Sequence, residues 1–224
     1  MNSIAGNIKK LTDELPLGVS LVAVTKTRTP EEAGEAYDAG LRTFGENRVQ
    51  EMAEKKSLLP SDISWHLIGH LQSNKVKQAV AAASMIESVD SVRLLRLIDD
   101  EAAAQGKTIN CLLQLHIATE QTKTGFSLSD AMDINWSEII SSLDAVKICG
   151  VMGMATFTEN TAKVRAEFKS LAGIFRLMRD VHFAGYEYFS EISMGMSGDW
   201  RVAVEEGSTM IRVGSLIFGE RIKK

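Results

Sequence analysis

The chain has few of the residues that mark secreted, disulfide-bonded or membrane proteins. Its 224 residues include only two cysteines, Cys111 and Cys149, and both lie within apolar runs. Two such cysteines cannot form a disulfide framework, so we expect reduced core thiols in a cytoplasmic protein. No segment approaches the length of about 20 apolar residues that a membrane-spanning helix needs, and we expect no signal peptide. These absences exclude a disulfide scaffold and predict no contact with a membrane.

Charge and residue spacing exclude two further classes of protein. The chain carries 25 lysine and arginine residues against 29 aspartate and glutamate residues, which gives a net charge of −4 at pH 7. A surface that binds nucleic acid needs an excess of positive charge, so we expect no nucleic-acid partner. The cysteines and the four histidines do not stand at the spacing of a metal site, so we expect no metal.

With only three prolines and no low-complexity linker, the chain repeats one pattern, an apolar strand followed by an amphipathic helix. The strands are rich in β-branched residues, which pack well on a pleated surface. The expected strands are residues 19–25, 42–45, 64–69, 85–89, 108–117, 146–152, 186–192 and 209–213. The expected helices are residues 30–39, 49–58, 73–83, 92–104, 128–143, 161–181 and 200–205, with a further short helix beginning near Ser215 or Leu216.

Eight alternations of strand and helix predict parallel strands joined by crossover helices. Such units close into a (β/α)8 TIM barrel, which we expect to be one domain spanning residues 1–224. An extra amphipathic helix precedes the barrel, because Ile4, Ile8, Leu11 and Leu15 recur at helical spacing. The alternative is an open, doubly wound α/β sheet, but no Gly-x-Gly-x-x-Gly fingerprint follows the first strand.

Lys26 follows the first expected strand, and active sites in TIM barrels lie at the carboxyl ends of the strands. Burial there would disfavour the ammonium form and lower the pKa of the amine. A neutral amine can attack an aldehyde and form a Schiff base. The alternative is that Lys26 only marks the end of the strand and points into solvent.

Glycine and serine collect after the last two expected strands, as Ser193, Gly195, Ser197, Gly214 and Ser215. The loops after strands 7 and 8 are the usual phosphate site of this fold. Glycine lets backbone N–H groups approach an anion closely, and serine adds a hydroxyl donor. Each loop taken alone could be an ordinary tight turn, but the two together favour a phosphate.

Arg212 lies within the last expected strand, where alternation places it on one face with Met210. Burying an arginine without a partner is costly. One interpretation is a structural salt bridge to Glu46 or Glu191. The other is that Arg212, which stays protonated at any working pH, donates a hydrogen bond to an acceptor on a ligand.

A lysine that can form an imine, a phosphate site and an arginine suit one cofactor, pyridoxal 5′-phosphate. Other residues at the strand ends carry weaker signals. Asn47 could contact the ring hydroxyl of the cofactor or cap the helix that follows. His66 and His70 share one strand face, and hydrogen-bonded core histidines are the simpler interpretation. Four methionines could line the cofactor or fill the core, and these are Met152, Met154, Met194 and Met196.

Several stretches of the chain resemble the pyridoxal phosphate homeostasis protein family, which is related to the N-terminal barrel of alanine racemase. The matching stretches are Leu-Val-Ala-Val-Thr-Lys26, Phe-Gly-Glu-Asn47-Arg-Val-Gln-Glu, Trp-His66-Leu-Ile-Gly-His-Leu-Gln-Ser-Asn-Lys, Lys123-Thr-Gly-Phe, Ser193-Met-Gly-Met-Ser, Ile-Arg212-Val-Gly-Ser and Ile-Phe-Gly-Glu-Arg221. They run through nearly the whole chain, and together they are specific. One small departure is Gly198, where members often carry another polar residue.

The resemblance implies an aldimine between pyridoxal phosphate and Lys26, with Arg212 near the pyridine nitrogen. It also implies that Ser193, Gly214 and Ser215 hold the phosphate. The residues that we expect around the cofactor are Lys26, Asn47, His66, Ser193, Met194, Arg212, Gly214 and Ser215.

The family is regarded as a vitamin B6 and amino-acid homeostasis factor without an established reaction. We therefore expect a cytoplasmic, monomeric protein that binds pyridoxal phosphate, transfers or buffers it, and is not an enzyme. Its partners beyond the cofactor would be free amino acids or apo-enzymes. Two alternatives stay open. One is an amino-acid racemase or decarboxylase, and the other is a class I aldolase in which Lys26 forms an imine with a phosphorylated sugar.

Two features argue against a racemase. Racemisation needs acid–base groups on both faces of the cofactor, and in alanine racemase a tyrosine of a separate C-terminal domain serves the second face. We expect no such domain here, and the three tyrosines, Tyr37, Tyr186 and Tyr188, fall in an expected helix and strand. In addition, Arg212 would repel a proton on the ring nitrogen and so weaken the electron sink.

Overall fold

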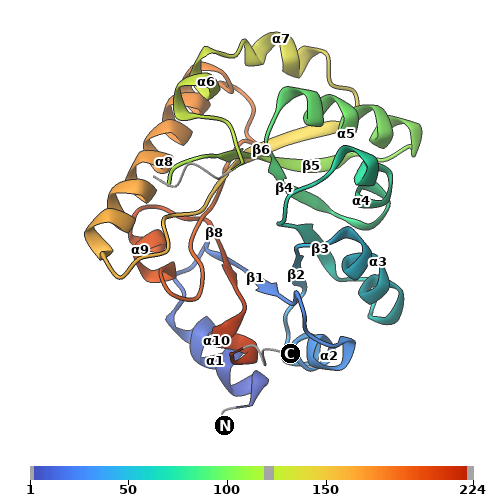
Figure 1. The fold of residues 1–224 in the computed structure, drawn as a ribbon, viewed down its shortest axis with the longest axis vertical. Coiled ribbons are helices and arrows are strands. Elements are labelled where there is room, and N and C mark those ends of the chain that lie inside the picture. Colours follow the sequence, from blue (N-terminus) through green and yellow to red (C-terminus); the bar gives the residue numbers. More distant parts are fainter. Residues whose placement is uncertain (1–2, 119–123, 221–224) are drawn as a thin grey trace.

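A closed barrel of eight parallel strands, in the order β1 to β8, forms the centre of the molecule (Figure 1). The computed structural model describes residues 3–118 and 124–220. The strands are β1 (Ser20–Val24), β2 (Thr43–Glu46), β3 (Ser64–Leu67), β4 (Met85–Val89), β5 (Ile109–Leu115), β6 (Val146–Gly153), β7 (Glu191–Ser193) and β8 (Met210–Val213). The barrel closes where β8 pairs with β1, with Arg212 beside Val22. The predicted (β/α)8 barrel is confirmed.

Helices surround the ring of strands in Figure 1. They are α1 (Ile4–Glu14), α2 (Pro30–Asp38), α3 (Val49–Leu58), α4 (Val76–Ala82), α5 (Val92–Ala104), α6 (Leu128–Asp133), α7 (Trp136–Ser141), α8 (Thr161–Val181), α9 (Trp200–Glu205) and α10 (Ser215–Phe218). The expected N-terminal helix is α1, which buries Ile8 and Leu11. It lies against α10, because Asn7 Nδ2 donates a hydrogen bond to the carbonyl oxygen of Ile217 at 2.9 Å.

Local signals explain where several helices begin. Thr29 and Glu32 form a capping box at the start of α2, and Pro30 occupies the first turn. This arrangement satisfies backbone N–H groups that have no partner within the helix. Ser91 caps α5 in a similar way, by accepting a hydrogen bond from the backbone N–H of Leu94. The bounds of α5 agree with those expected from the sequence.

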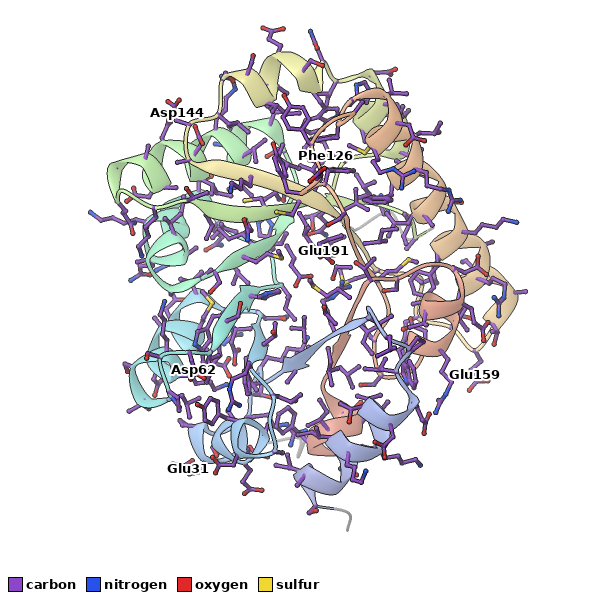
Figure 2. The ribbon with its side chains drawn as sticks, turned by 180° about the vertical axis from the view of Figure 1, so that it is seen from behind. Glu31, Asp62, Phe126, Asp144, Glu159 and Glu191 are labelled. Carbon is purple, nitrogen blue, oxygen red and sulfur yellow. The ribbon has the colours of Figure 1, made fainter. Side chains whose placement is uncertain are left out.

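Side chains point into the barrel interior in the view from behind (Figure 2). An apolar cluster occupies part of it, formed by Val22, Met85, Leu112, Cys149, Met152 and Met210. On β8, Ile211 and Val213 belong instead to the larger core that packs around the barrel. Arg212 therefore shares the inner face with Met210, as the strand alternation predicted.

The seventh strand is shorter than predicted, and residues 186–190 lie outside it. β7 begins only at Glu191, and the backbone N–H of Phe189 donates to the carbonyl oxygen of Tyr186 in a turn. The rings of Phe183 and Phe189 stack with centroids 3.9 Å apart. Aromatic residues favour strands in general, but here packing between rings holds them in a turn.

The helix predicted over residues 128–143 is two helices, α6 and α7. The break falls at Ile134, and Asn135 begins a new helix by accepting a hydrogen bond from the backbone N–H of Glu138. Trp136 Nε1 reaches back to the carbonyl oxygen of Ala131 at 2.7 Å. The residues expected as one helix from 73 to 83 begin as a 3-10 turn, Ser73–Lys75, before α4.

Both cysteines are buried and neither forms a disulfide. Burial raises the pKa of the Cys149 thiol to about 11 and that of Cys111 well above its usual value. Such thiols are inert, as expected of core residues. Among residues 3–118 and 124–220, no helix has both the length and the apolar composition needed to cross a membrane.

Candidate functional site

A cavity of about 790 Å³ opens at the carboxyl ends of the strands. Five of the eight residues expected around the cofactor line it, namely Lys26, Asn47, Arg212, Gly214 and Ser215. They follow β1 and β2, or belong to β8 and the residues directly after it, so segments from the two halves of the sequence meet in this cavity. This is the end of the barrel where the fold places its active sites.

Lys26 stands in the turn after β1 and is half-buried. Val24, two residues earlier on the inner face, lines the same cavity. The next residue, Thr27, has a φ of 65°, a conformation that is rare for a β-branched side chain. Lys26 therefore sits in a strained turn with its side chain at the cavity wall.

Asn47 also lines the cavity. The residue that caps α3 is Arg48, and no side-chain hydrogen bond caps this helix. Helix capping, one of the two interpretations of Asn47, is therefore wrong. Its backbone lies so close to Gly69 that a Cβ on Gly69 would come within 2.4 Å of the carbonyl oxygen of Asn47. A glycine at position 69 thus lets the segments that follow β2 and β3 approach each other at the cavity wall.

Arg212 is almost fully buried, at 4% exposure, yet it reaches the cavity. Its Nη1 donates to Ser193 Oγ at 2.5 Å, and its Nη2 donates to the carbonyl oxygen of Gly153 at 3.0 Å. Burial lowers the pKa of Arg212, while the charges of Glu87 and Asp199 act to raise it. The guanidinium is thus held in one orientation by two neighbouring strands.

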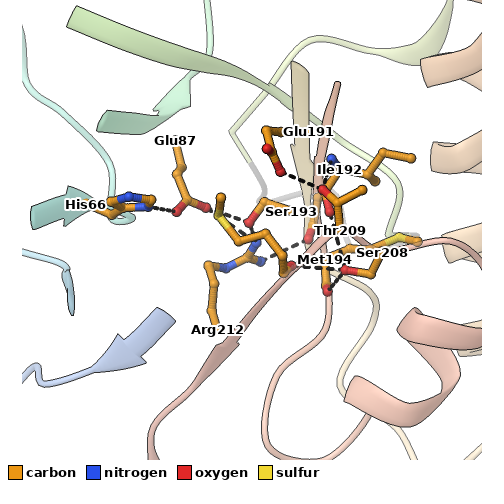
Figure 3. A network of polar contacts seen from close by, with 11 residues as sticks. His66, Glu87, Glu191, Ile192, Ser193, Met194, Ser208, Thr209 and Arg212 are labelled. Atoms are coloured by element: carbon orange, nitrogen blue, oxygen red, sulfur yellow. Dashed lines mark hydrogen bonds and ion pairs between the residues drawn. The ribbon is translucent and has the colours of Figure 1, made fainter. Parts of the chain in front are cut away.

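The charged partner of Arg212 is Glu87, at 3.7 Å, so the salt bridge to Glu46 or Glu191 considered from the sequence is wrong. Glu87 lies on β4 and is completely buried. Its Oε2 accepts a hydrogen bond from Ser193 Oγ at 2.6 Å, and its Oε1 lies 2.7 Å from His66 Nδ1. Figure 3 shows these four side chains as one connected chain across the barrel.

The environment of Glu87 favours its ionised form. Burial alone would raise the pKa of this carboxyl group, but the hydrogen bonds from His66 and Ser193 and the charge of Arg212 outweigh burial and lower it. Sequence reasoning missed Glu87. The available signal was a single carboxylate within the apolar strand 85–89, because a buried charge requires a partner.

Backbone hydrogen bonds join β7 to β8, from Thr209 N–H to the carbonyl oxygen of Ile192 at 3.0 Å and from Met194 N–H to that of Met210 at 3.1 Å, and side chains add to them. Ser208 Oγ lies 2.7 Å from the carbonyl oxygen of Met194 and 2.9 Å from that of Met210, so its one hydrogen can be donated to either. Thr209 Oγ1 accepts from the backbone N–H of Ile192 at 2.8 Å. These contacts, also drawn in Figure 3, fix the two glycine- and serine-rich loops relative to each other.

Ser197 belongs to the loop after β7 and was not among the eight residues expected around the cofactor. Its Oγ accepts hydrogen bonds from the backbone N–H groups of Gly214 and Leu216, at 3.3 and 3.4 Å. All three residues line the cavity. Two backbone donors therefore converge on a hydroxyl oxygen at the cavity wall, which is the arrangement that an anion needs. The signal in the sequence was the serine four residues after Ser193.

Three expected residues do not line the cavity. His66 and Ser193 lie beneath it in the Glu87 network. Met194 belongs to the core outside the barrel, because it follows the inward-facing Ser193 on a strand whose side chains alternate. Met154 and Met196 line the cavity in its place. Lys123 and Arg221, named in the matching stretches, lie outside the described residues.

His70 lines the cavity at its rim, and its Nδ1 lies 3.2 Å from Asp90 Oδ2. Among the described residues, no three histidine, cysteine, aspartate or glutamate side chains are placed to hold a metal ion. None of the three tyrosines lines the cavity. The site therefore offers an amine, an arginine and converging amide donors, a combination that suits an aldehyde carrying an anionic group.

Comparison with known proteins points the same way. The sequence profile of the family described as alanine racemase, N-terminal domain, matches residues 1–222. The pyridoxal phosphate homeostasis protein of Aquifex aeolicus is 36% identical over 203 residues, which cover 90% of this chain and 86% of that protein. That of Escherichia coli strain K12 is 31% identical over 239 residues, which cover 99% and 98%.

Solved structures are similar as well. PipY of Synechococcus elongatus with pyridoxal phosphate bound is 37% identical, with a TM-score of 0.87, and the match covers 97% of this chain and all of that chain. An alanine racemase of Clostridium difficile shares the fold, with a TM-score of 0.73 at 12% identity, and this chain covers 57% of its length.

Proposed function

This chain belongs to the family of pyridoxal phosphate homeostasis proteins, and we propose that it holds pyridoxal 5′-phosphate in the cavity at the carboxyl ends of its strands. The observation that carries the proposal is the meeting of Lys26, Arg212 and the two loops after β7 and β8 in one cavity. The names of the relatives and the pyridoxal phosphate in the PipY structure support it.

Each part of the cavity has a role in this proposal. The amine of Lys26 bonds covalently to the aldehyde carbon, and Arg212 faces the ring nitrogen. The backbone N–H groups of Gly214 and Leu216, which now meet at Ser197 Oγ, donate to the phosphate together with the hydroxyls of Ser197 and Ser215. Ser193 was expected in this set, but its hydroxyl is engaged with Glu87 and Arg212, so we assign it to holding the arginine.

The chemistry of the bound group is that of an aldehyde that condenses with amines. The protein's own contribution is to hold this aldehyde on Lys26 until another amine takes it, either a free amino acid or a lysine of an apo-enzyme. We propose that the function is intracellular pyridoxal phosphate homeostasis by binding and release. We further propose that residues 1–224 act as one domain and as a monomer, for which light scattering of the purified protein should give a mass near 24.5 kDa.

Lys26 is tested by chemical trapping. Protein loaded with pyridoxal phosphate should absorb visible light, and borohydride reduction followed by peptide mapping should place the label on Lys26. Lys26→Ala should remain folded and lose the visible band. A label only on Lys75 or Lys123 would contradict the assignment. A protein with no visible band that traps a phosphorylated sugar would favour the aldolase alternative.

The phosphate contacts predict discrimination between two aldehydes. Losing several hydrogen bonds to a charged group, each worth about 1.5–3 kcal/mol, should weaken binding by orders of magnitude. Pyridoxal without the phosphate should therefore bind far more weakly than the phosphate ester in a titration followed by absorbance. Equal affinities would remove the loops after β7 and β8 from the proposal.

We propose that the chain does not turn over amino acids at the rate of an enzyme. Two observations support this. A positively charged Arg212, rather than a carboxylate, lines the cavity, and no tyrosine lines it to act on the second face of the ring. Enzymes turn over at about 1–1,000 per second. When the loaded protein is mixed with amino acids in deuterated water, exchange of the α-hydrogen should stay far below this range. Rapid exchange would favour the racemase or decarboxylase alternative.

A further inference from the structure

A buried lysine lies outside the barrel, directly behind the turn that carries Lys26. Lys55 is on α3 and is only 3% exposed. Its Nζ donates to the carbonyl oxygen of Thr25 at 2.6 Å, to Glu46 Oε1 at 2.6 Å and to Glu51 Oε1 at 2.8 Å. None of these four residues lines the cavity.

The contacts of this cluster converge on the two residues that flank Lys26. On one side, Thr25 Oγ1 donates to Glu46 Oε1 at 2.6 Å. On the other side, the backbone N–H of Thr27 donates to Glu51 Oε1, also at 2.6 Å. Both carboxylate oxygens are the ones that Lys55 contacts. The ammonium of Lys55 therefore links the end of β1 to the residue that follows Lys26.

The charged cluster contributes little to stability, because removing its charged groups from water costs free energy. Glu46 is completely buried, and its Oε2 has no hydrogen-bond partner among the described residues. Burial raises the pKa of Glu46, against the hydrogen bonds from Lys55 and Thr25. Well-packed apolar residues often replace a buried ion pair without loss of stability. Stability alone therefore gives no reason for charged groups in this position.

The backbone conformation of Thr27 supplies a reason. Its φ of 65° is strained for a β-branched residue, and such strain persists only where the surrounding structure over-determines it. The hydrogen bond from Thr27 to Glu51, whose carboxylate Lys55 holds, is a contact that enforces this conformation. The strained turn directs the Lys26 side chain toward the cavity.

We propose that Lys55, acting through Glu51 and Glu46, is a positioning residue that holds the turn after β1 so that the Lys26 amine is pre-oriented to bond the cofactor aldehyde. The proposal rests on the proposed function, since it concerns the same lysine. Misplacing a reacting group by about 1 Å can cost roughly a hundredfold in rate. Loosening the turn should therefore slow bond formation at Lys26 more than it changes folding.

The test compares variants of the full chain that change one contact each. Glu51→Ala removes the acceptor of the Thr27 N–H, Glu51→Gln retains an acceptor oxygen, and Thr27→Gly relieves the strain and frees the backbone. Glu54→Ala is the matched control, because Glu54 is an exposed carboxylate one turn along the same helix. The measurements are the rate at which the visible band grows after mixing with pyridoxal phosphate, the yield of borohydride label on Lys26, and the unfolding temperature without the cofactor.

Glu51→Ala and Thr27→Gly should slow the growth of the band by about tenfold or more, whereas Glu51→Gln and Glu54→Ala should stay close to the parent protein. Thr27→Gly should slow the growth of the band while its unfolding temperature stays unchanged or rises. A turn that served only stability would not give this combination. The double variant Lys55→Met, Glu46→Leu replaces the buried charges with apolar groups. It should fold, because the two fully buried charges are removed together and Glu51, whose side chain is 23% exposed, stays in contact with water, and it should also be slow.

Two results would overturn the proposal. One is that Glu51→Ala and Thr27→Gly form the band as fast as Glu54→Ala. The other is that the rate falls only in step with the unfolding temperature. A different result would contradict the proposed function itself, namely that the parent protein gives no visible band and no label on Lys26.

Discussion

At the scale of single residues, the pairing of Arg212 with Glu87 limits which substitutions can test the chemistry of the ring. Arg212→Glu would place a carboxylate beside the ring nitrogen of the cofactor, where a negative charge favours protonation of that nitrogen. It would also put a second negative charge beside the buried Glu87, which now lies 3.7 Å from the guanidinium. An uncompensated buried charge typically costs about 3–5 kcal/mol.

We therefore expect Arg212→Glu to lose more stability than Arg212→Gln, although both remove the guanidinium. Adding Glu87→Gln should restore much of the loss in Arg212→Glu and little in Arg212→Gln. The measurement is the free energy of unfolding in urea for Arg212→Glu and Arg212→Gln, each with and without Glu87→Gln. The four values are compared as in a double-mutant cycle. Equal stability of Arg212→Glu and Arg212→Gln would show that Glu87 carries no charge in the folded protein.

The ionisation of Glu87 also predicts a dependence of stability on pH. Its pKa in the folded protein is lowered from the ordinary value of 4.5. The contribution of this carboxylate to stability is therefore present above that value and is lost as the pH falls through the lowered pKa in the folded state. The difference in unfolding free energy between the parent protein and Glu87→Gln should shrink as the pH falls below about 4.5. A difference that grows on acidification would contradict this sign.

At the scale of elements, Asp99 joins α5 to the start of β6. It is 7% exposed, and its carboxylate accepts the backbone N–H groups of Asp144, Ala145 and Val146, at 3.1, 2.8 and 2.9 Å. These N–H groups lie just before β6 or at its first residue, where no neighbouring strand among the described residues offers them a carbonyl acceptor. One side chain thus replaces several backbone contacts at the amino end of the barrel.

Asp99→Ala should therefore leave buried N–H groups unsatisfied, at a cost of about 1–3 kcal/mol for each group. Asp99→Asn keeps one acceptor oxygen and should lose less. Chemical unfolding measures both losses. Binding of pyridoxal phosphate should not change, because the cavity lies at the opposite, carboxyl end of the strands. Loss of the visible band in a folded Asp99→Ala protein would show that the two ends of the barrel are coupled.

At the scale of the whole molecule, the proposed cofactor site spans the closure of the barrel. Lys26 follows β1, while Gly214 and Ser215 follow β8, and these two strands pair to close the ring. A cofactor bonded to Lys26 and held by its phosphate at Gly214 would connect the first and last strands. The site that joins these two strands exists only in the folded chain, so cofactor binding there should add to the free energy of unfolding.

We therefore expect pyridoxal phosphate at about 100 times its dissociation constant to stabilise the protein by about 2.7 kcal/mol. The unfolding temperature should rise with cofactor concentration. Inorganic phosphate should give a smaller rise, because it binds only at the Gly214 side of the site and forms no bond to Lys26. Lys26→Ala should show only this smaller effect with either compound. A full rise in Lys26→Ala would mean that the covalent bond does not contribute.

The order and type of most elements followed from the sequence because hydrophobic periodicity is a local property. The bounds of α3, α5 and α8 agree with the ranges read from the chain. The predictions were wrong where particular side-chain contacts override the average preferences of the residues. Ring stacking between Phe183 and Phe189 holds a turn where aromatic residues predicted a strand, and a side-chain cap at Asn135 divides a predicted helix.

The sequence by itself determined the barrel, the strand end that carries Lys26 and the glycine- and serine-rich loops, since strand alternation and parallel connections leave little freedom in these features. Only the tertiary structure decided which polar groups meet. Glu87 became the partner of Arg212, Ser197 rather than Ser193 reached the cavity wall, and Lys55 came to lie behind Lys26. Partners for buried charges are chosen by distance across the closed barrel, and distance in space is not encoded by spacing along the chain.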